Sequence, residues 1–137
     1  VPNFRNSSKL NLIPKKIIPN LRNSKNLSQK LQKQEEGKLI LNKVSNTDHL
    51  ILLDENGKEM NSIVFSKFLQ KHMNSGIKRL VLVIGGPYGF SDAVYQKASY
   101  KLALSKMTFS HQMIRLFTIE QLYRGFSILK NEPYHHH

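Results

Sequence analysis

The chain has 137 residues, with 21 lysines and arginines against 9 aspartates and glutamates, a net charge of +12 and no cysteine. This length fits one domain with a moderate core, and 39% hydrophobic residues is too many for a wholly disordered chain. The lack of cysteine excludes disulfides, thiolate zinc sites, iron–sulfur clusters and cysteine nucleophiles. No apolar run reaches the roughly 20 residues of a membrane span, and no signal-peptide pattern opens the chain, so we expect a soluble, cytoplasmic protein.

Positive charge is concentrated at the N-terminal end, because residues 1–34 contain eight lysines and arginines and no acidic residue. A basic surface attracts polyanions, so RNA, DNA or an anionic membrane could each be the partner. A composition biased toward lysine and asparagine would give the same charge without any partner. The RNA interpretation therefore needs support from other features.

The first 44 residues are predicted to be partly irregular. Residues 1–26 are rich in Pro, Asn and Ser, and the only possible strand in them is Leu10–Ile18, which Pro14 would confine to a sheet edge. Ser28 is predicted to cap a helix that runs to about Val44. Its apolar residues Leu31, Leu39 and Ile40 should share one side, and Gly37 should be a weak point.

From residue 49 the sequence alternates between strands and helices. Apolar runs predict three buried strands, and amphipathic or capped segments predict three helices between and after them. The expected strands are Leu50–Leu53, ended by a turn at Asp54–Gly57, Leu80–Ile84 and Tyr100–Leu104; the expected helices are Ser62–Met73, a short one from Ser91, and His111–Leu129. This alternation favours an α/β fold, a parallel sheet with helices on both faces.

The carboxyl ends of parallel strands are where ligands bind in such folds. Three ends stand out here: Leu53–Gly57, Ile84–Gly89 and Leu104–Phe109. Gly85 and Gly86 would let the backbone approach a ligand closely, although ordinary turn chemistry explains two glycines equally well.

Common catalytic motifs are missing from the sequence. There is no P-loop, no G-x-G-x-x-G, no H-E-x-x-H and no G-x-S-x-G. These absences count against ATPases, dehydrogenases, zinc hydrolases and α/β-hydrolases, and we expect no metal site.

Several side chains near the C-terminus are candidates for substrate contact. His111 should lie at the N-terminus of the last helix, where the helix dipole disfavours the imidazolium, and it suits a cap contact as well as a substrate contact. Arg115 and Arg124 could each pair with a phosphate or with Glu120. At the end of the chain, an affinity tag would explain His136 and His137 but not Pro133-Tyr134.

Four segments together are specific for one family: Ile84–Gly89, Leu104–Met113, Glu120–Arg124 and Tyr134–His135. In this order they resemble the ribosomal large-subunit pseudouridine N3-methyltransferases of the SPOUT superfamily, over residues 9 to 137. In that family a Tyr-His pair at the very end is native sequence, so His135 and His136 are interpreted as native.

The resemblance implies a fold, a cofactor and a partner. It implies an α/β domain with a trefoil knot, a homodimer that binds S-adenosylmethionine in the knot, and methylation of N3 of a pseudouridine in large-subunit (23S) ribosomal RNA. It implies that the cofactor is held by Leu53, Gly85, Gly86, Leu104, Ser105, Lys106, Met107, Thr108 and Phe109. Leu53 and Met107 would then cover the adenine.

Substrate and catalytic roles are assigned from the chemistry of this reaction and the composition of the tail. His111 and Arg115 are expected to contact the substrate, and the catalytic candidates are His135, Tyr134 and Arg124. The proton on N3 must leave, so His135, or less favourably His111, would accept it directly or an ordered water would do so. Tyr134 could position the base, and Arg124 could hold a phosphate. The tail of one subunit could reach the cofactor of the other.

One departure concerns the start of the chain. Members of this family open with an additional strand and helix, which residues 1–8 do not resemble. We expect a single domain over residues 1–137, truncated at its start and with a knotted part over 49–137. Two rivals stay open: a SPOUT enzyme acting on another RNA such as tRNA, and a non-enzymatic RNA-binding protein.

Overall fold

The computed structural model describes residues 9–13, 28–85 and 88–136, which form one parallel sheet and four helices. The sheet has the strand order β1-β3-β2-β4. Its strands are β1 (Lys9–Ile13), β2 (Asp48–Glu59), β3 (Arg79–Ile84) and β4 (Tyr100–Ala103), and the helices are α2 (Gln29–Lys43), α3 (Ser62–Asn74), α4 (Asp92–Lys97) and α5 (His111–Leu129).

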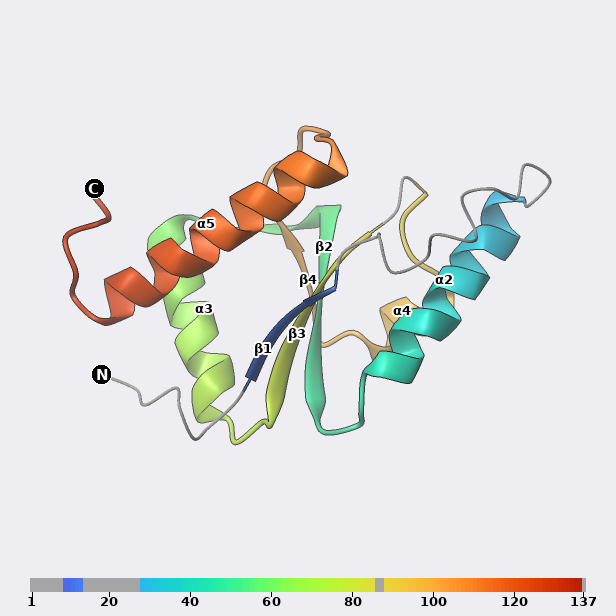
Figure 1. The fold of residues 1–137 in the computed structure, drawn as a ribbon, viewed down its shortest axis with the longest axis horizontal. Helices are drawn as coiled ribbons and strands as arrows, with labels where there is room; N and C mark the ends of the chain where they lie inside the picture. The colour runs from blue at the N-terminus through green and yellow to red at the C-terminus, as the bar shows by residue number, and fades with distance from the viewer. Residues whose placement is uncertain (1–8, 14–27, 86–87, 137) are drawn as a thin grey trace.

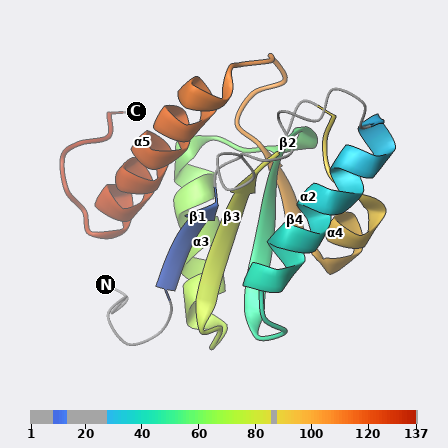
Figure 2. The same ribbon diagram turned by 45° about the vertical axis from the view of Figure 1, so that its right-hand side comes forward.

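The helices form two layers around the sheet. α3 and α5 cover one face, and α2 and α4 cover the other (Figure 1, Figure 2). The expected α/β fold with helices on both faces is therefore confirmed. None of the described helices is long and apolar enough to cross a membrane.

Alternating side chains of the central strands divide the core into two clusters. In β2, Ile51 and Leu53 face the α3–α5 layer, whereas Leu50 and Leu52 face the α2–α4 layer. The register pairs Leu50 with Val81 and Ile51 with Leu82, so β3 contributes to both clusters in the same alternation. Strands buried on both faces explain why their sequence reads as continuous apolar runs.

Each helix starts with a side-chain cap, which confirms the predicted starts. The caps accept a hydrogen bond from the backbone N–H three residues on: Ser28 from Leu31, Asn61 from Val64, Ser91 from Val94 and Ser110 from Met113. The bounds of the later strands and of the two longer helices that follow β2 agree with expectation within one residue. These elements are β3, β4, α3 and α5. β2 differs by more.

The turn expected at Asp54–Gly57 is wrong, because β2 continues to Glu59. The register with β4 shifts there: Leu53 pairs with Leu102, and Lys58 pairs with Leu102 again. The four residues 54–57 thus bulge out of the ladder instead of reversing the chain.

One expectation for α2 is also wrong. Leu31 and Leu39 are 43% and 38% exposed, and only Ile40 of the three apolar residues is buried. The expected weakness at Gly37 stays a prediction, but the structure shows a reason for glycine there: it is buried where α2 meets α4, and a Cβ would collide with Ser91 Oγ. β1 is an edge strand as expected, while residues 14–18 of the predicted strand and residues 1–8 lie outside the described part.

Candidate cofactor pocket

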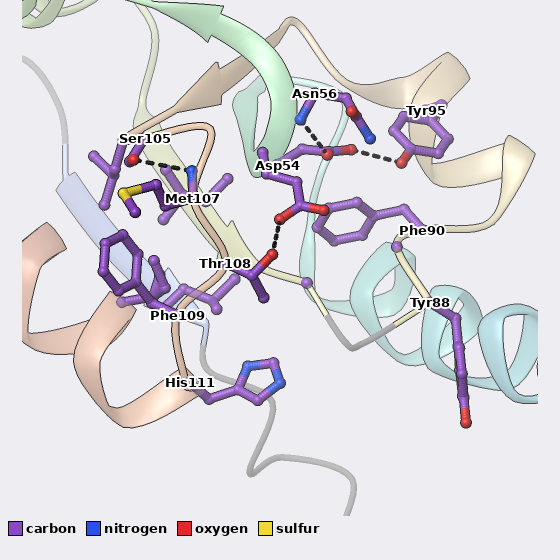
Figure 3. Close-up of a pocket in the computed structure, with 17 residues that line it drawn as sticks. Asp54, Asn56, Tyr88, Phe90, Tyr95, Ser105, Met107, Thr108, Phe109 and His111 are labelled. Atoms are coloured by element: carbon purple, nitrogen blue, oxygen red, sulfur yellow. Dashed lines mark hydrogen bonds between the residues drawn. The ribbon is translucent and has the colours of Figure 1, made fainter.

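A pocket of about 450 Å³ opens at the carboxyl end of β3 and at the bulge of β2, where the pairing of these two strands ends. Its remaining walls are the segment 88–90, Tyr95 of α4, the loop after β4 and the first turn of α5 (Figure 3). This is the edge of the sheet at which the sequence predicted ligand binding.

The inner wall of the pocket is apolar. Leu53 and Ile84, the last pair of the β2–β3 ladder, are buried, and Phe90 is 5% exposed. A Cβ at Gly85 would lie 2.8 Å from the Phe90 ring, so only glycine lets this ring pack against the end of β3. These side chains make the inner wall apolar.

The opposite wall carries two carboxylates from the bulge of β2. Asp54 accepts hydrogen bonds from the Tyr95 hydroxyl at 2.7 Å and from the Asn56 backbone N–H at 2.9 Å. Glu55 accepts one from the Thr108 hydroxyl at 2.8 Å, which joins this wall to the loop after β4 (Figure 3). Burial, and then the hydrogen bond to Asp54, raise the pKa of Tyr95 to about 12, so its hydroxyl remains a donor at neutral pH.

The loop after β4 forms the outer wall. The Met107 backbone N–H donates to Ser105 Oγ at 3.0 Å, a local turn that fixes the loop. Met107 is 72% exposed, and Phe109 packs edge-on against Phe117 of α5. His111, the first residue of α5, lies at the rim (Figure 3).

The structure brings most of the sequence-predicted cofactor residues together. The pocket is lined by Leu53, Gly85, Leu104, Ser105, Met107, Thr108 and Phe109, and by the predicted substrate residue His111. Lys106 and Arg115 are exposed and are not among its described lining residues, and Gly86 lies outside the described part of the chain.

Sequence reasoning missed part of the lining. Asp54, Glu55 and Asn56 belong to a strand end that the sequence singled out, but their side chains were not assigned to the site. Tyr95 lies on a short helix and carried no signal in the sequence. Its contact with Asp54 spans 41 residues and depends on how α4 packs beside β2.

A second polar cluster lies on the C-terminal half of α5, from Glu120 onward. Glu120 accepts hydrogen bonds from both Nε and Nη2 of Arg124, at 2.9 and 2.7 Å. Of the two partners that the sequence suggests for this arginine, a phosphate or Glu120, the structure shows Glu120. Nη1 of Arg124 lies 3.0 Å from Nδ1 of His135, and Tyr134 stacks under the guanidinium with 4.7 Å between Cζ and the ring centroid. Arg124 therefore contacts both of the other predicted catalytic side chains, His135 and Tyr134.

This tail cluster does not reach the pocket of its own chain. His111 and Arg124 are thirteen residues apart on one helix, which is about 20 Å at the rise of an α-helix. After α5 the tail turns back and lies beside the C-terminal half of the helix (Figure 1, Figure 2), where it contacts Arg124 and Glu120.

The pocket suits a small molecule with both apolar and polar parts. Its volume lies within the range of small-molecule sites, and its apolar inner wall faces the polar side chains of Asp54 and Glu55. Among the described residues, no three His, Asp or Glu side chains lie close enough to hold a metal ion.

Comparison with known proteins agrees with this geometry. The family described as "Predicted SPOUT methyltransferase" matches residues 3–135. Curated proteins named "Ribosomal RNA large subunit methyltransferase H" are similar over 120 residues, which is 88% of this chain and 76% of theirs: those of Flavobacterium johnsoniae at 68% identity, Flavobacterium psychrophilum at 69% and Parabacteroides distasonis at 61%. The resemblance found in the sequence is thereby confirmed, whereas the trefoil knot stays an expectation from the family. The chain belongs to the SPOUT methyltransferase family.

Proposed function

We propose that this protein transfers the methyl group of S-adenosylmethionine to N3 of a pseudouridine in large-subunit (23S) ribosomal RNA, on the assembled ribosome in the cytoplasm. The observation that carries the proposal is the pocket at the strand ends, lined by the motif residues Leu53, Gly85 and Leu104–Phe109 except Lys106. The high identity to proteins named as large-subunit RNA methyltransferases supports the choice of RNA.

The cofactor supplies an electrophilic methyl group on a sulfonium, and the protein mainly supplies alignment. Leu53 and Met107 would cover the adenine, and backbone groups of the loop after β4 would meet its polar edge. Lys106 projects from the same loop without lining the pocket, so we assign it to phosphate contact at the rim.

The active form is a homodimer in this proposal, because the site is incomplete in one chain. The pocket lies at the N-terminal end of α5 and the tail cluster on its C-terminal half, so the tail of a second subunit would have to complete the site. One side of α5 is apolar and exposed, which suits such an interface. Its residues are Met113, Leu116, Ile119 and Tyr123, with exposures of 41%, 58%, 49% and 56%.

The hydrogen bond between Arg124 and His135 limits what His135 can do. The bond to Glu120 raises the pKa of Arg124 above its already high usual value, and a guanidinium has no acceptor, so Nδ1 of His135 must be the acceptor. A neutral ring then carries its hydrogen on Nε2. While this contact holds, His135 donates to the substrate, and an ordered water accepts the N3 proton.

Tyr134 and Arg124 would orient the target nucleotide. The Tyr134 hydroxyl is fixed by donating to Glu120 at 3.2 Å, so its ring is held in one position for stacking on a base. The net charge of +12 attracts ribosomal RNA without reading many bases, which suits recognition of an assembled shape.

The test is transfer of labelled methyl groups to intact ribosomes that lack the modification, with free ribosomal RNA and tRNA in parallel. We expect label only in the large-subunit RNA of intact ribosomes, at a rate that falls steeply with salt. Label in tRNA would favour a different RNA substrate. Cofactor binding without label in any RNA would contradict the proposed activity, and lack of cofactor binding would favour a non-enzymatic RNA-binding protein.

A further inference from the structure

The charge of the cofactor pocket is opposite to that of the molecule. The chain carries a net charge of +12, yet the described lining includes the carboxylates of Asp54 and Glu55 and no lysine or arginine. The positive side chains nearest in sequence, Lys58, Lys101 and Lys106, are exposed and stay outside the lining.

Asp54 is the better placed of the two carboxylates. Asp54 is half-buried, whereas Glu55 is exposed, so water screens the charge of Asp54 less than that of Glu55. Both of its oxygens have fixed donors, the Tyr95 hydroxyl on Oδ2 and the Asn56 N–H on Oδ1. A carboxylate held in this way acts on a ligand through its field and needs no direct bond.

Charge is also what separates the cofactor from its product. S-adenosylmethionine has a sulfonium, an ammonium and a carboxylate, so it carries one net positive charge. Loss of the methyl group leaves the sulfur as a neutral thioether, and S-adenosylhomocysteine has no net charge. The two molecules otherwise have nearly the same shape.

We infer that Asp54, positioned by Tyr95, makes the pocket prefer the cationic cofactor to its neutral product. This inference rests on the proposed function and deepens it. The attraction is present for the sulfonium and vanishes once the methyl group leaves, so the same pocket binds the incoming cofactor and releases the product. Tyr95 is a positioning residue here, because it acts through Asp54.

The experiment is calorimetric titration of the full chain with S-adenosylmethionine, S-adenosylhomocysteine and sinefungin, which has an ammonium in place of the methyl sulfonium. Asp54→Asn should weaken binding of both cations about tenfold, and binding of the neutral product less than about twofold. Tyr95→Phe should give a smaller change with the same selectivity. Glu59→Gln is the matched control, since it removes one charge from the exposed end of β2 outside the pocket.

Equal weakening of all three compounds by Asp54→Asn, or no weakening of any, would overturn the inference. Circular dichroism of each variant separates a binding defect from misfolding, and Tyr95→Phe keeps the test open if Asp54→Asn does not fold. If the unaltered chain binds neither the cofactor nor its product, the proposed function itself fails, and the inference fails with it.

Discussion

Asp48 and Arg79 are register partners on β2 and β3, and their side chains form an ion pair with 2.7 Å between Oδ2 and Nη2. The Asp48 side chain is only 4% exposed and also accepts the Ser45 backbone N–H at 2.9 Å. The pair lies at the amino ends of the strands, opposite the pocket. It ties the start of β2 to β3 and so supports the site from a distance.

We therefore expect Arg79→Ala to destabilise the fold strongly. It would leave the buried Asp48 carboxylate without its cationic partner, which costs about 3 kcal/mol or more. The measurement is urea denaturation. Lys38→Ala, which removes the exposed pair with Glu35, is the control and should change stability by less than about 1 kcal/mol. Equal effects of the two substitutions would contradict the structural role of Asp48.

A second prediction concerns the stability of the fold at acid pH. His72 and His49 share a hydrogen bond of 2.7 Å between their Nδ1 atoms. Burial, and then the charges of His49 and Lys71, lower the pKa of His72 from 6.5 to about 4. Between pH 6.5 and pH 4, His72 binds a proton more readily in the unfolded chain than in the folded one. The contribution of His72 to the free energy of unfolding is therefore fully present above pH 6.5 and decreases as the pH falls toward 4.

Urea denaturation at pH 7, 5.5 and 4.5 measures this fall. His72→Gln keeps a donor and an acceptor at the site but has no titrating ring, so its stability should depend less on pH over this range. A pH dependence as steep as that of the unaltered chain would show that other groups cause it.

The close approach of β2 to β4 at Gly57 gives a third prediction. A Cβ at Gly57 would lie 2.8 Å from the backbone of Lys101 and Leu102, which cannot move aside as a side chain can. Gly57→Ala should push β2 from β4, lower stability by about 2 kcal/mol and weaken cofactor binding. Gly76→Ala is the control: its φ of +80° is strained for alanine, but nothing lies within 4 Å, so about 1 kcal/mol is expected. A milder effect at Gly57 than at Gly76 would refute the argument.

The exposed side of α5 gives a fourth prediction. Leu116→Glu should put a charge into the proposed dimer interface, shift the protein to monomers in sedimentation and reduce methyl transfer at least about tenfold. Cofactor binding should change little, because the pocket is built from one chain. Val64→Glu, which puts the same charge on an exposed apolar residue of α3 outside this stripe, is the control. A Leu116→Glu variant that stays dimeric would place the interface elsewhere.

The role of His135 gives a fifth prediction. If Nε2 donates to the substrate, His135→Gln should keep part of the rate through its amide N–H, whereas His135→Ala should lose at least about tenfold. Rates at saturating ribosome measure this. Equal loss in both variants would favour His135 as the proton acceptor, and full activity of His135→Ala would remove it from the mechanism.

Local signals in the sequence were enough for most of the fold. Ser28 and Ser91 mark helix starts because a cap needs only its own neighbours, and continuous apolar runs mark β2 and β3 because both of their faces are buried. The site motifs could be found by family resemblance, and the strand-end rule placed them at one edge. Contacts between distant segments could not be predicted: Gly37 against Ser91, Tyr95 on Asp54, and the second pairing of β2 with β4 all depend on how finished elements pack.

The bulge of β2 supplies side chains to the pocket without taking part in the pairing with β4. Leu53 and Lys58 both pair with Leu102, so the strand resumes its register after residues 54–57 regardless of what those side chains are. Insertions, deletions or grafted sequences in positions 54–56 should therefore be tolerated by the fold while they remodel the pocket, provided that Gly57 is kept. This short segment is the natural starting point for engineering an enzyme of this type toward altered cofactors.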